Sequence, residues 1–215
     1  MTEDYLEPHL DRAALLLIDV QQDFIDGALP VPGTSEILPR LIRLADAFRA
    51  AHRPIVHVVR LYQPGSSDTD TVRRATIENG ARIVAPGTEG AQPPAALLPG
   101  GQRVSLDAEL LLSGAPQPLA ADETIIYKPR WSAFYRNGLD EQLRERGVDT
   151  LVVAGCNLPN CPRATLFDAS ERDYRTVLVV DAVSQSTPER VADLELIGVR
   201  SMTSDGLESA LAADR

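Results

Sequence analysis

Continuous apolar segments recur along the chain, and each ends at a turn residue or a charged residue. Six of them predict strands: Ala13–Val20, Pro54–Arg60, Glu123–Lys128, Thr150–Ala154, Thr176–Asp181 and the shorter Gly198–Met202. Apart from Gly198–Met202, their apolar residues are mostly consecutive rather than alternating with polar ones. This pattern is typical of parallel strands that helices cover on both faces of a sheet.

Segments with helical spacing separate these strands. Ser35–Ala51 repeats its apolar residues at helical intervals, with Thr34 or Ser35 as the expected N-cap. Further helices are expected over Asp68–Glu78, Leu139–Arg146, Asn160–Asp173, from a Thr187 cap onward, and over Asp205–Ala213. The alternation of strand and helix predicts an α/β fold: a doubly wound, mostly parallel six-stranded sheet in a three-layer α/β/α sandwich.

Residues 86–118 interrupt this regular alternation. The segment holds six prolines and five glycines, and a short helix is expected at Leu106–Leu112. Long loops in compact domains are usually lids, binding loops or oligomer contacts. With 215 residues and no evident repeat or linker, the chain predicts a single domain over 1–215 with a Pro/Gly-rich loop insertion at about 86–118.

The charge balance limits the partners. The chain carries 31 acidic and 21 basic residues, for a formal charge of −10, and no basic cluster. It therefore lacks the electrostatic footprint of a protein that binds nucleic acid or an anionic membrane. Ala13–Ile18 is too short to span a bilayer, and Met1–Leu10 is acidic and unlike a signal peptide. We expect a cytoplasmic protein with a small-molecule substrate.

Three reactive side chains lie at the ends of predicted strands: Asp19 and Lys128 end the first and third strands, and Cys161 follows the fourth by one tight turn. In a doubly wound sheet, ligands bind beyond the carboxyl ends of the strands. Each residue alone has an ordinary explanation: Asp19 as a turn cap, Cys161 as a small buried residue, and Lys128 as a surface lysine left by chance beside twenty arginines. Together they favour a site that combines an acid, an amine and a thiol.

The two cysteines have different settings. Cys161 begins a predicted helix, whose dipole is expected to lower the thiol pKa. Cys156 lies at the exit of a strand and is expected to pack in the interior. Two cysteines five residues apart provide neither a disulfide scaffold nor the spacing of zinc ligands.

Other chemistries find little support. His57 lies in the middle of an apolar strand, as a core histidine would, and the chain has no Gly-x-Ser-x-Gly elbow. It also lacks a P-loop and a Gly-x-Gly-x-x-Gly fingerprint. We therefore expect no cofactor.

Three separated motifs carry a family resemblance. They are Leu16-Leu17-Ile18-Asp19-Val20-Gln21-Gln22-Asp23-Phe24, Lys128-Pro129-Arg130-Trp131-Ser132-Ala133-Phe134, and Ala154-Gly155-Cys156-Asn157-Leu158-Pro159-Asn160-Cys161. In order and spacing they resemble the signature blocks of the isochorismatase-like cysteine hydrolases. The similarity extends over roughly residues 13–184.

The resemblance implies a catalytic triad of Asp19, Lys128 and Cys161. Asp19 would take the thiol proton, Lys128 would support the pair by its charge, and Cys161 would attack a carbonyl carbon to form a thioester. The backbone N–H groups of Asn157 and Cys161 would form the oxyanion hole. The family also implies a non-proline cis peptide bond, here at Cys156–Asn157.

Further properties follow from the resemblance alone. Gln21, Phe24 and Trp131 match positions that often line the family's pocket, although ordinary packing explains them as well. Family members usually form homo-oligomers, either dimers or tetramers. Branches with an active-site metal carry Asp-x-His and a second His after the second strand. This chain reads Val58-Val59-Arg60-Leu61-Tyr62-Gln63 there, so no metal site is expected.

Three functions remain open from the sequence. The retained Cys161 favours a metal-independent hydrolase that cleaves the C–N bond of a small amide, ureide or carbamoyl compound. The second is an isochorismatase-type vinyl-ether hydrolase, in which Asp19 acts as an acid and Cys161 is incidental. The third is a non-catalytic member of the fold.

Overall fold

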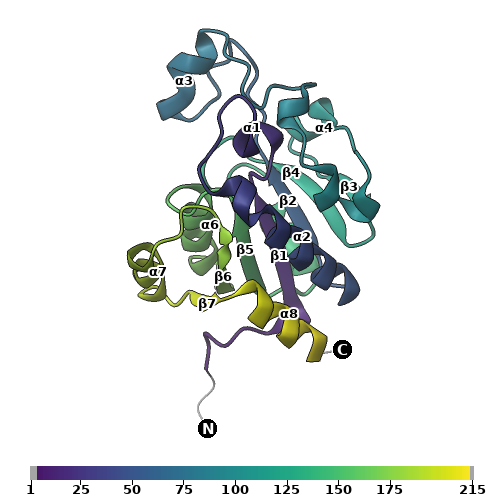
Figure 1. Ribbon diagram of the computed structural model, residues 1–215, viewed down its shortest axis with the longest axis vertical. Coiled ribbons are helices and arrows are strands. Elements are labelled where there is room, and N and C mark those ends of the chain that lie inside the picture. Colours follow the sequence, from purple (N-terminus) through teal and green to yellow (C-terminus); the bar gives the residue numbers. More distant parts are fainter. Residues whose placement is uncertain (1–3, 214–215) are drawn as a thin grey trace.

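The computed structural model describes residues 4–213, which contain a seven-stranded sheet (Figure 1). The strand order is β3-β4-β2-β1-β5-β6-β7, and only the β3–β4 pair is antiparallel. The strands are β1 (Ala13–Ile18), β2 (Ile55–Val59), β3 (Gln117–Ala120), β4 (Glu123–Tyr127), β5 (Thr150–Gly155), β6 (Arg175–Val183) and β7 (Arg200–Met202). The α/β class and the mostly parallel sheet are thus confirmed.

Eight α-helices accompany the sheet within residues 4–213. They are α1 (Gln22–Ile25), α2 (Thr34–Ala50), α3 (Thr71–Glu78), α4 (Ala108–Leu112), α5 (Leu139–Glu145), α6 (Cys161–Ser170), α7 (Pro188–Glu195) and α8 (Ser204–Ala213). Thr187 caps α7 as predicted, since its side chain accepts a hydrogen bond from the Arg190 N–H. At α2 the cap differs, because Gly33 is the N-cap and the Thr34 hydroxyl bonds Ser184 instead.

The central strand β1 shows how the layers form. All six of its residues are buried. Because side chains alternate along a strand, Leu15 and Leu17 pack with α2 and α8 on one face of the sheet. Leu16 and Ile18 pack with residues of α5, α6 and α7 on the other. Figure 1 shows α2 and α8 on the near side of the strands. The expected three-layer sandwich is therefore present.

The seventh strand was not predicted. β3 lies at the end of the Pro/Gly-rich segment and pairs antiparallel with β4, with an irregularity in register between Pro118 and Ala120. A proline, which lacks an N–H, is tolerated in such an edge strand. The rest of that segment forms three short 3-10 helices, Glu89–Ala91, Ala95–Leu97 and Pro99–Gly101, followed by α4 near the helix expected at Leu106–Leu112.

The Pro/Gly-rich segment is packed against the body of the protein. Ala91, Leu97, Leu106 and Leu111 are buried, and three of them share a cluster with Phe24. Within the described residues, none of the helices is long and apolar enough to cross a membrane.

The order of the strands determines where a site can form. From β1 the chain proceeds to β2 and β4 on one side of the sheet, and from β5 to β6 and β7 on the other. β1 and β5 are neighbours, and the connections after them diverge. Such a switch point leaves a crevice beyond the carboxyl ends of the strands.

Candidate active site

Three strand ends bring Asp19, Lys128 and Cys161 together. Asp19 directly follows β1, Lys128 directly follows β4, and Cys161 begins α6 after β5. Asp19 has a φ of 53°, in the left-handed region that non-glycine residues rarely adopt. Backbones of this kind persist where the surroundings enforce them, and they cluster at functional sites.

Lys128 is bound to Asp19. Its Nζ lies 2.9 Å from Asp19 Oδ2 and 3.3 Å from the Arg130 carbonyl oxygen. Lys128 is 0% exposed and Asp19 is 3% exposed. The interpretation of Lys128 as a surface lysine left by chance is therefore wrong. A buried ammonium is stable only beside a negative charge, and Asp19 supplies that charge.

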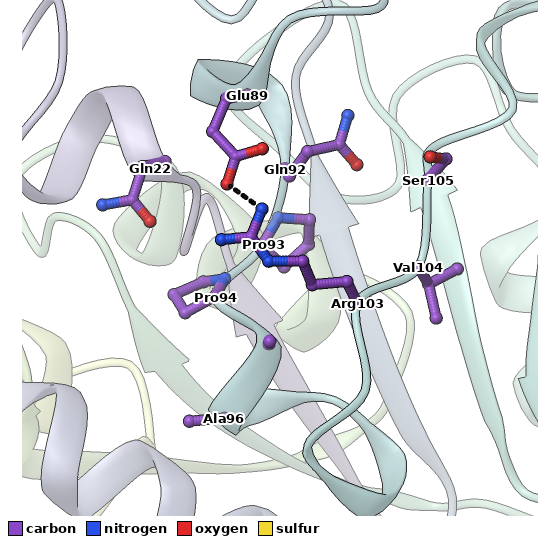
Figure 2. A pocket seen from close by; sticks show the side chains of 10 residues that line it. Gln22, Glu89, Gln92, Pro93, Pro94, Ala96, Arg103, Val104 and Ser105 are labelled. Atoms are coloured by element: carbon purple, nitrogen blue, oxygen red, sulfur yellow. Dashed lines mark ion pairs between the residues drawn. The ribbon is translucent and has the colours of Figure 1, made fainter.

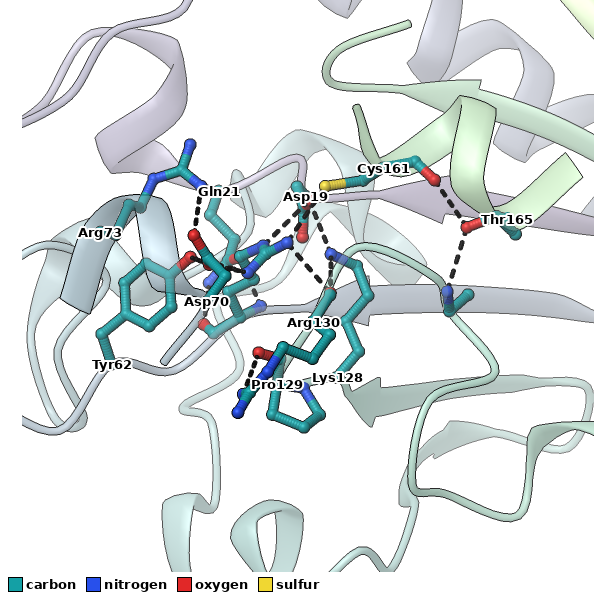
Figure 3. A network of polar contacts seen from close by, with 12 residues as sticks. Asp19, Gln21, Tyr62, Asp70, Arg73, Lys128, Pro129, Arg130, Cys161 and Thr165 are labelled. Atoms are coloured by element: carbon teal, nitrogen blue, oxygen red, sulfur yellow. Dashed lines mark hydrogen bonds and ion pairs between the residues drawn. The ribbon is translucent and has the colours of Figure 1, made fainter. Parts of the chain in front are cut away.

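The second oxygen of Asp19 has no comparable partner. Asp19 Oδ1 is buried and accepts no hydrogen bond within residues 4–213. The Cys161 thiol is close enough for the two groups to shift each other's pKa, and Figure 3 shows its sulfur beside the Asp19 carboxylate. One carboxylate oxygen is thus bound to cations, while the other is free to accept a proton.

The two acids are in opposite protonation states at rest. Burial acts to raise the pKa of Asp19, but the charges of Lys128 and Arg60 outweigh it and hold the pKa below its ordinary value. Burial and the Asp19 charge raise the pKa of Cys161. The resting site therefore pairs a carboxylate with a neutral thiol. The pKa of Cys161 is therefore raised rather than lowered as expected, because burial and Asp19 outweigh the opposing charges of Lys128 and Arg60.

Cys156 has a different environment from Cys161. It is buried, and desolvation raises its thiol pKa to about 12. Thr34 and Ser184 are its hydrogen-bonding neighbours. A thiol with so high a pKa is a poor nucleophile at neutral pH, so its surroundings agree with the expected packing role.

The turn between β5 and α6 presents unpaired backbone donors. The Cys156–Asn157 peptide bond is cis, as the family resemblance implied. Neighbouring N–H groups are paired, Leu158 with the Ser184 carbonyl and Asn160 with the Asn157 carbonyl. The N–H groups of Asn157 and Cys161 have no acceptor within the described part of the chain. Both therefore remain available to an external oxygen.

Gly155 lets this turn approach β1. Its φ is +114°, and a Cβ placed there would lie 2.3 Å from the Ile18 carbonyl oxygen. Any other residue would push the strand ends apart, because that contact is with backbone that cannot give way. Gly155 therefore sets the close approach of the Cys161 turn to Asp19.

Arg60 is a site residue that the sequence reasoning missed. It follows β2 and is 1% exposed. Its Nη2 lies 3.3 Å from Cys161 Sγ, and its Nε lies 3.5 Å from Asp19 Oδ2. Its Nη1 donates to a second carboxylate, Asp70 Oδ2, at 2.8 Å. The available signal was its position, since it ends a strand as Asp19 and Lys128 do.

The three residues proposed to line a pocket have different surroundings. Gln21 is 0% exposed, and its amide bonds the Arg60 N–H and carbonyl and the Ala91 carbonyl. Phe24 is buried in the cluster that includes Val59. Trp131 lines a cavity of about 430 Å³ with Leu29, Val72, Arg73, Thr76, Ile83 and Asn160. Gln21 and Phe24 thus support the site from within the protein, and Trp131 borders open space.

This cavity is lined by two residues that adjoin the site, Asn160 and Trp131. Asn160 directly precedes Cys161, and the Trp131 ring lies 5.0 Å from Arg60 Cζ. A second pocket, of about 380 Å³, lies on the Pro/Gly-rich segment and includes the exposed ion pair of Glu89 and Arg103 (Figure 2). None of Asp19, Lys128 and Cys161 lines that second pocket. None of these three lines the cavity at Trp131 either, but its wall includes Asn160, which precedes Cys161, and Trp131, which packs on Arg60.

The residues after β2 do not fit a metal ion. Metal-binding branches of the family would place histidines there, but this chain places the Arg60 guanidinium, which only donates hydrogen bonds. Within residues 4–213, no three His, Cys, Asp or Glu side chains are grouped so that they could hold a metal.

A doubly wound sheet with an acid, an amine and a thiol at its switch point defines a class of α/β hydrolases with a cysteine at the site. The chain belongs to the isochorismatase family, whose domain model matches residues 13–208.

Individual relatives extend this finding. A probable inactive nicotinamidase from Arabidopsis thaliana is 34% identical over 89% of this chain and 92% of its own length. The ureidoacrylate amidohydrolase RutB of Methylobacterium radiotolerans is 30% identical over 81% of this chain and 68% of its own. The crystal structure of an isochorismatase family protein from Desulfovibrio vulgaris is 33% identical, covers 94% of this chain and 98% of its own, and superposes with a TM-score of 0.78. The comparisons support a hydrolase of C–N bonds.

Proposed function

We propose that this protein is a cysteine-dependent amidohydrolase that cleaves a C–N bond of a small amide, ureide or carbamoyl compound through a thioester on Cys161. One observation carries the proposal. Asp19 is an ionised carboxylate with Oδ2 bound to Lys128 and Oδ1 unpartnered, beside the neutral thiol of Cys161. A base and its nucleophile are therefore held together before any substrate arrives.

The first step moves one proton and forms one bond. Asp19 Oδ1 accepts the proton of the Cys161 thiol, and the sulfur attacks the carbonyl carbon of the substrate. The electron pair of the C=O bond moves to oxygen. The unpaired N–H groups of Asn157 and Cys161 are suited to receive that oxyanion.

The second step releases the amine. Asp19, now protonated, donates its proton to the substrate nitrogen, the C–N bond breaks, and the thioester remains. Asp19 is again a carboxylate and takes a proton from a water molecule that attacks the thioester. The acid product leaves, and the proton returns to Cys161.

Lys128 stabilises Asp19 in its ionised form between these steps. Its ammonium lies on Oδ2, away from the oxygen that exchanges the proton. A cation on one oxygen lowers the basicity of the carboxylate without occupying its second oxygen. This keeps Asp19 ionised at rest while Oδ1 remains available.

The substrate would enter through the cavity at Trp131. That cavity of about 430 Å³ is large enough for a small molecule, and Asn160 at its wall directly precedes the nucleophile. The similarity to a ureidoacrylate amidohydrolase supports a ureide or carbamoyl group as the scissile part.

The activity is tested by a screen of amides, ureides and carbamoyl compounds for release of ammonia or amine. For the best substrate, we expect Cys161→Ala to lower kcat by roughly 10⁴-fold or more, the scale seen when an enzyme loses its nucleophile. Cys156→Ser is the matched control, because Cys156 is equally buried but its pKa of about 12 makes it inert. It should retain most of the activity.

Chemical labelling of the Cys161 thiol separates the three possible functions. Rapid inactivation by iodoacetamide, with a single label on Cys161, supports thiol chemistry. Vinyl-ether cleavage that survives the label would point to the isochorismatase reaction and contradict the proposal. No turnover with any compound, by wild type or variant, would leave a non-catalytic member of the fold.

A further inference from the structure

The guanidinium of Arg60 has five N–H donors, and all of them are used. Nε donates to Asp19 Oδ2 at 3.5 Å. Nη1 donates to the Tyr62 hydroxyl at 2.7 Å and to Asp70 Oδ2 at 2.8 Å. Nη2 donates to the Arg130 carbonyl at 3.0 Å and to Cys161 Sγ at 3.3 Å. No donor remains to clamp an anionic group of a substrate.

The position of this guanidinium is enforced from several sides. The Gln21 amide bonds both the N–H and the carbonyl of Arg60. The rings of Trp131 and Tyr62 lie 5.0 Å and 5.6 Å from Arg60 Cζ. Aromatic faces attract a cation and exclude water from it. A fixed, desolvated charge acts on its neighbours more strongly than a solvated one.

We propose that Arg60 is a further catalytic residue, whose guanidinium stabilises the Cys161 thiolate during the proton transfer to Asp19. The proposal rests on the proposed function for its meaning in catalysis, but its central contact, Arg60 Nη2 to Cys161 Sγ, is independent of any substrate.

The five contacts differ in what the reaction does to them. The Arg130 carbonyl, the Tyr62 hydroxyl and the Asp70 carboxylate have the same protonation state before and after the proton transfer. When the proton moves, Asp19 loses its negative charge and Cys161 Sγ gains one. The guanidinium contacts both groups. It therefore stabilises the negative charge on the Asp19 oxygen before the proton transfer and on the sulfur after it, without a change of position. An interaction that strengthens at the developing anion lowers the barrier.

Lys128 and Arg60 therefore have separate roles. Lys128 contacts the carboxylate and the Arg130 carbonyl, whereas Arg60 contacts both the carboxylate and the sulfur. Arginine suits this place because its fork reaches several acceptors at once and keeps its proton.

Asp70 is the positioning residue for this arginine. Its Oδ2 accepts from Arg60 Nη1 and from the Tyr62 hydroxyl, and it is 2% exposed. The buried cation thus has a carboxylate on the side away from the thiol. That pairing compensates the buried positive charge of Arg60 after Asp19 has been protonated.

The test measures the pH dependence of alkylation of Cys161 by iodoacetamide, in a Cys156→Ser background so that one thiol reports. Only the thiolate reacts. The charged and titratable groups facing this sulfur are Asp19, Lys128, Arg60 and the replaced Cys156. In Arg60→Met we expect the midpoint to rise, so that alkylation at neutral pH is about tenfold slower or more. Arg60→Lys, which keeps the charge, should react faster than Arg60→Met.

Arg73→Met is the matched control. Arg73 shares Asp70 at 3.3 Å and the Trp131 ring at 5.4 Å, but its described contacts do not include Cys161. Its alkylation midpoint should equal that of the parent protein. The single variant Arg60→Met leaves the buried Asp70 carboxylate without its cation and could fail to fold for that reason. In that case the double variant Arg60→Met/Asp70→Asn removes both charges and should show the same raised midpoint.

An unchanged or lowered midpoint in the Arg60 variants would overturn the proposal, and so would an equal shift in Arg73→Met. The two hypotheses fail separately. A raised midpoint in a protein without amidase activity would support the role of Arg60 at the thiol and reject the proposed function. Amide hydrolysis with an unchanged alkylation midpoint would support the proposed function and reject the role of Arg60 at the thiol.

Discussion

At the scale of single residues, Lys128 offers a sharp test. We expect Lys128→Arg to fold but to lower kcat by about 10²-fold. The ammonium sits 2.9 Å from Asp19 Oδ2 in a fully buried position. A planar guanidinium is wider, and displacing a reacting group by about 1 Å has a cost of this order. Steady-state kinetics with circular dichroism provide the measurement.

The exposed Arg136 is the control for this exchange. Its ion pair with Asp68 lies at the surface, with Arg136 58% exposed. Arg136→Lys should therefore leave kcat and KM near wild type. A wild-type kcat in well-folded Lys128→Arg would remove the ammonium from the proposed mechanism.

The residues that the sequence predicted share one property, since each is placed by the end of a strand. The proximity of Asp19, Lys128 and Cys161 could be predicted from the sequence because parallel strands end at one edge of the sheet. Arg60 also ends a strand, but arginine is ordinarily exposed. Its burial depends on Asp70, ten residues later in a loop whose path no periodicity describes.

At the scale of elements, a buried network of hydrogen bonds connects β4 with α2, β2 and the Pro/Gly-rich segment. Glu123, at the start of β4, bonds Arg49 of α2 at 2.7 Å and His57 of β2 at 2.6 Å. Arg49 also donates to the Leu97 carbonyl in the Pro/Gly-rich segment. His57 is 2% exposed and bonds Glu123, which agrees with its interpretation as a core residue.

We expect Glu123→Gln to destabilise the protein by about 3 kcal/mol, because it breaks a buried pair and leaves Arg49 and His57 without their carboxylate. Urea unfolding gives the free energy. Glu89→Gln is the matched control, since its ion pair with Arg103 is exposed at 65% and 81%. It should change stability by no more than about 0.5 kcal/mol. Equal effects of the two variants would show that the network does not stabilise the fold.

Most elements followed from local patterns, and β3 did not. The parallel strands are buried on both faces and leave an apolar signal, as in β1 and β5. β3 alternates between half-buried and exposed residues and contains Pro118. Its strand conformation depends on pairing with β4, which is a tertiary contact that its own four residues do not encode.

At the scale of the whole molecule, strand order was the part of the fold that the sequence left undetermined. The crossover rules restrict handedness but allow β5 to lie on either side of the sheet. Its observed place beside β1, with Gly155 against Ile18, brings the Cys161 turn to Asp19. The family resemblance implied a triad of Asp19, Lys128 and Cys161, but the strand order that brings them together was not predicted.

Two buried carboxyls, Asp19 and Glu123, contribute to how the stability of the molecule responds to acid. In the folded protein, the charges of Lys128 and Arg60 outweigh burial and lower the pKa of Asp19 below 3.8. Arg49 and His57 likewise outweigh burial at Glu123 and lower its pKa below 4.5. Unfolding restores ordinary values, so near pH 4 the unfolded chain binds more protons than the folded one. Stability from these groups is present above their ordinary pKa values and is lost as the pH falls through the folded ones.

We therefore expect the free energy of unfolding to decrease between about pH 5 and pH 3, by up to about 1.4 kcal/mol per pH unit for each such carboxyl. Urea unfolding at a series of pH values measures this slope. Glu123→Gln removes one of the titrating groups and should make the slope shallower, whereas Glu89→Gln, at an exposed ion pair, should leave it unchanged. If the wild-type protein became more stable toward pH 3, unfolding would be releasing protons, and the ion pairs of Asp19 and Glu123 could not be holding their carboxyls ionised.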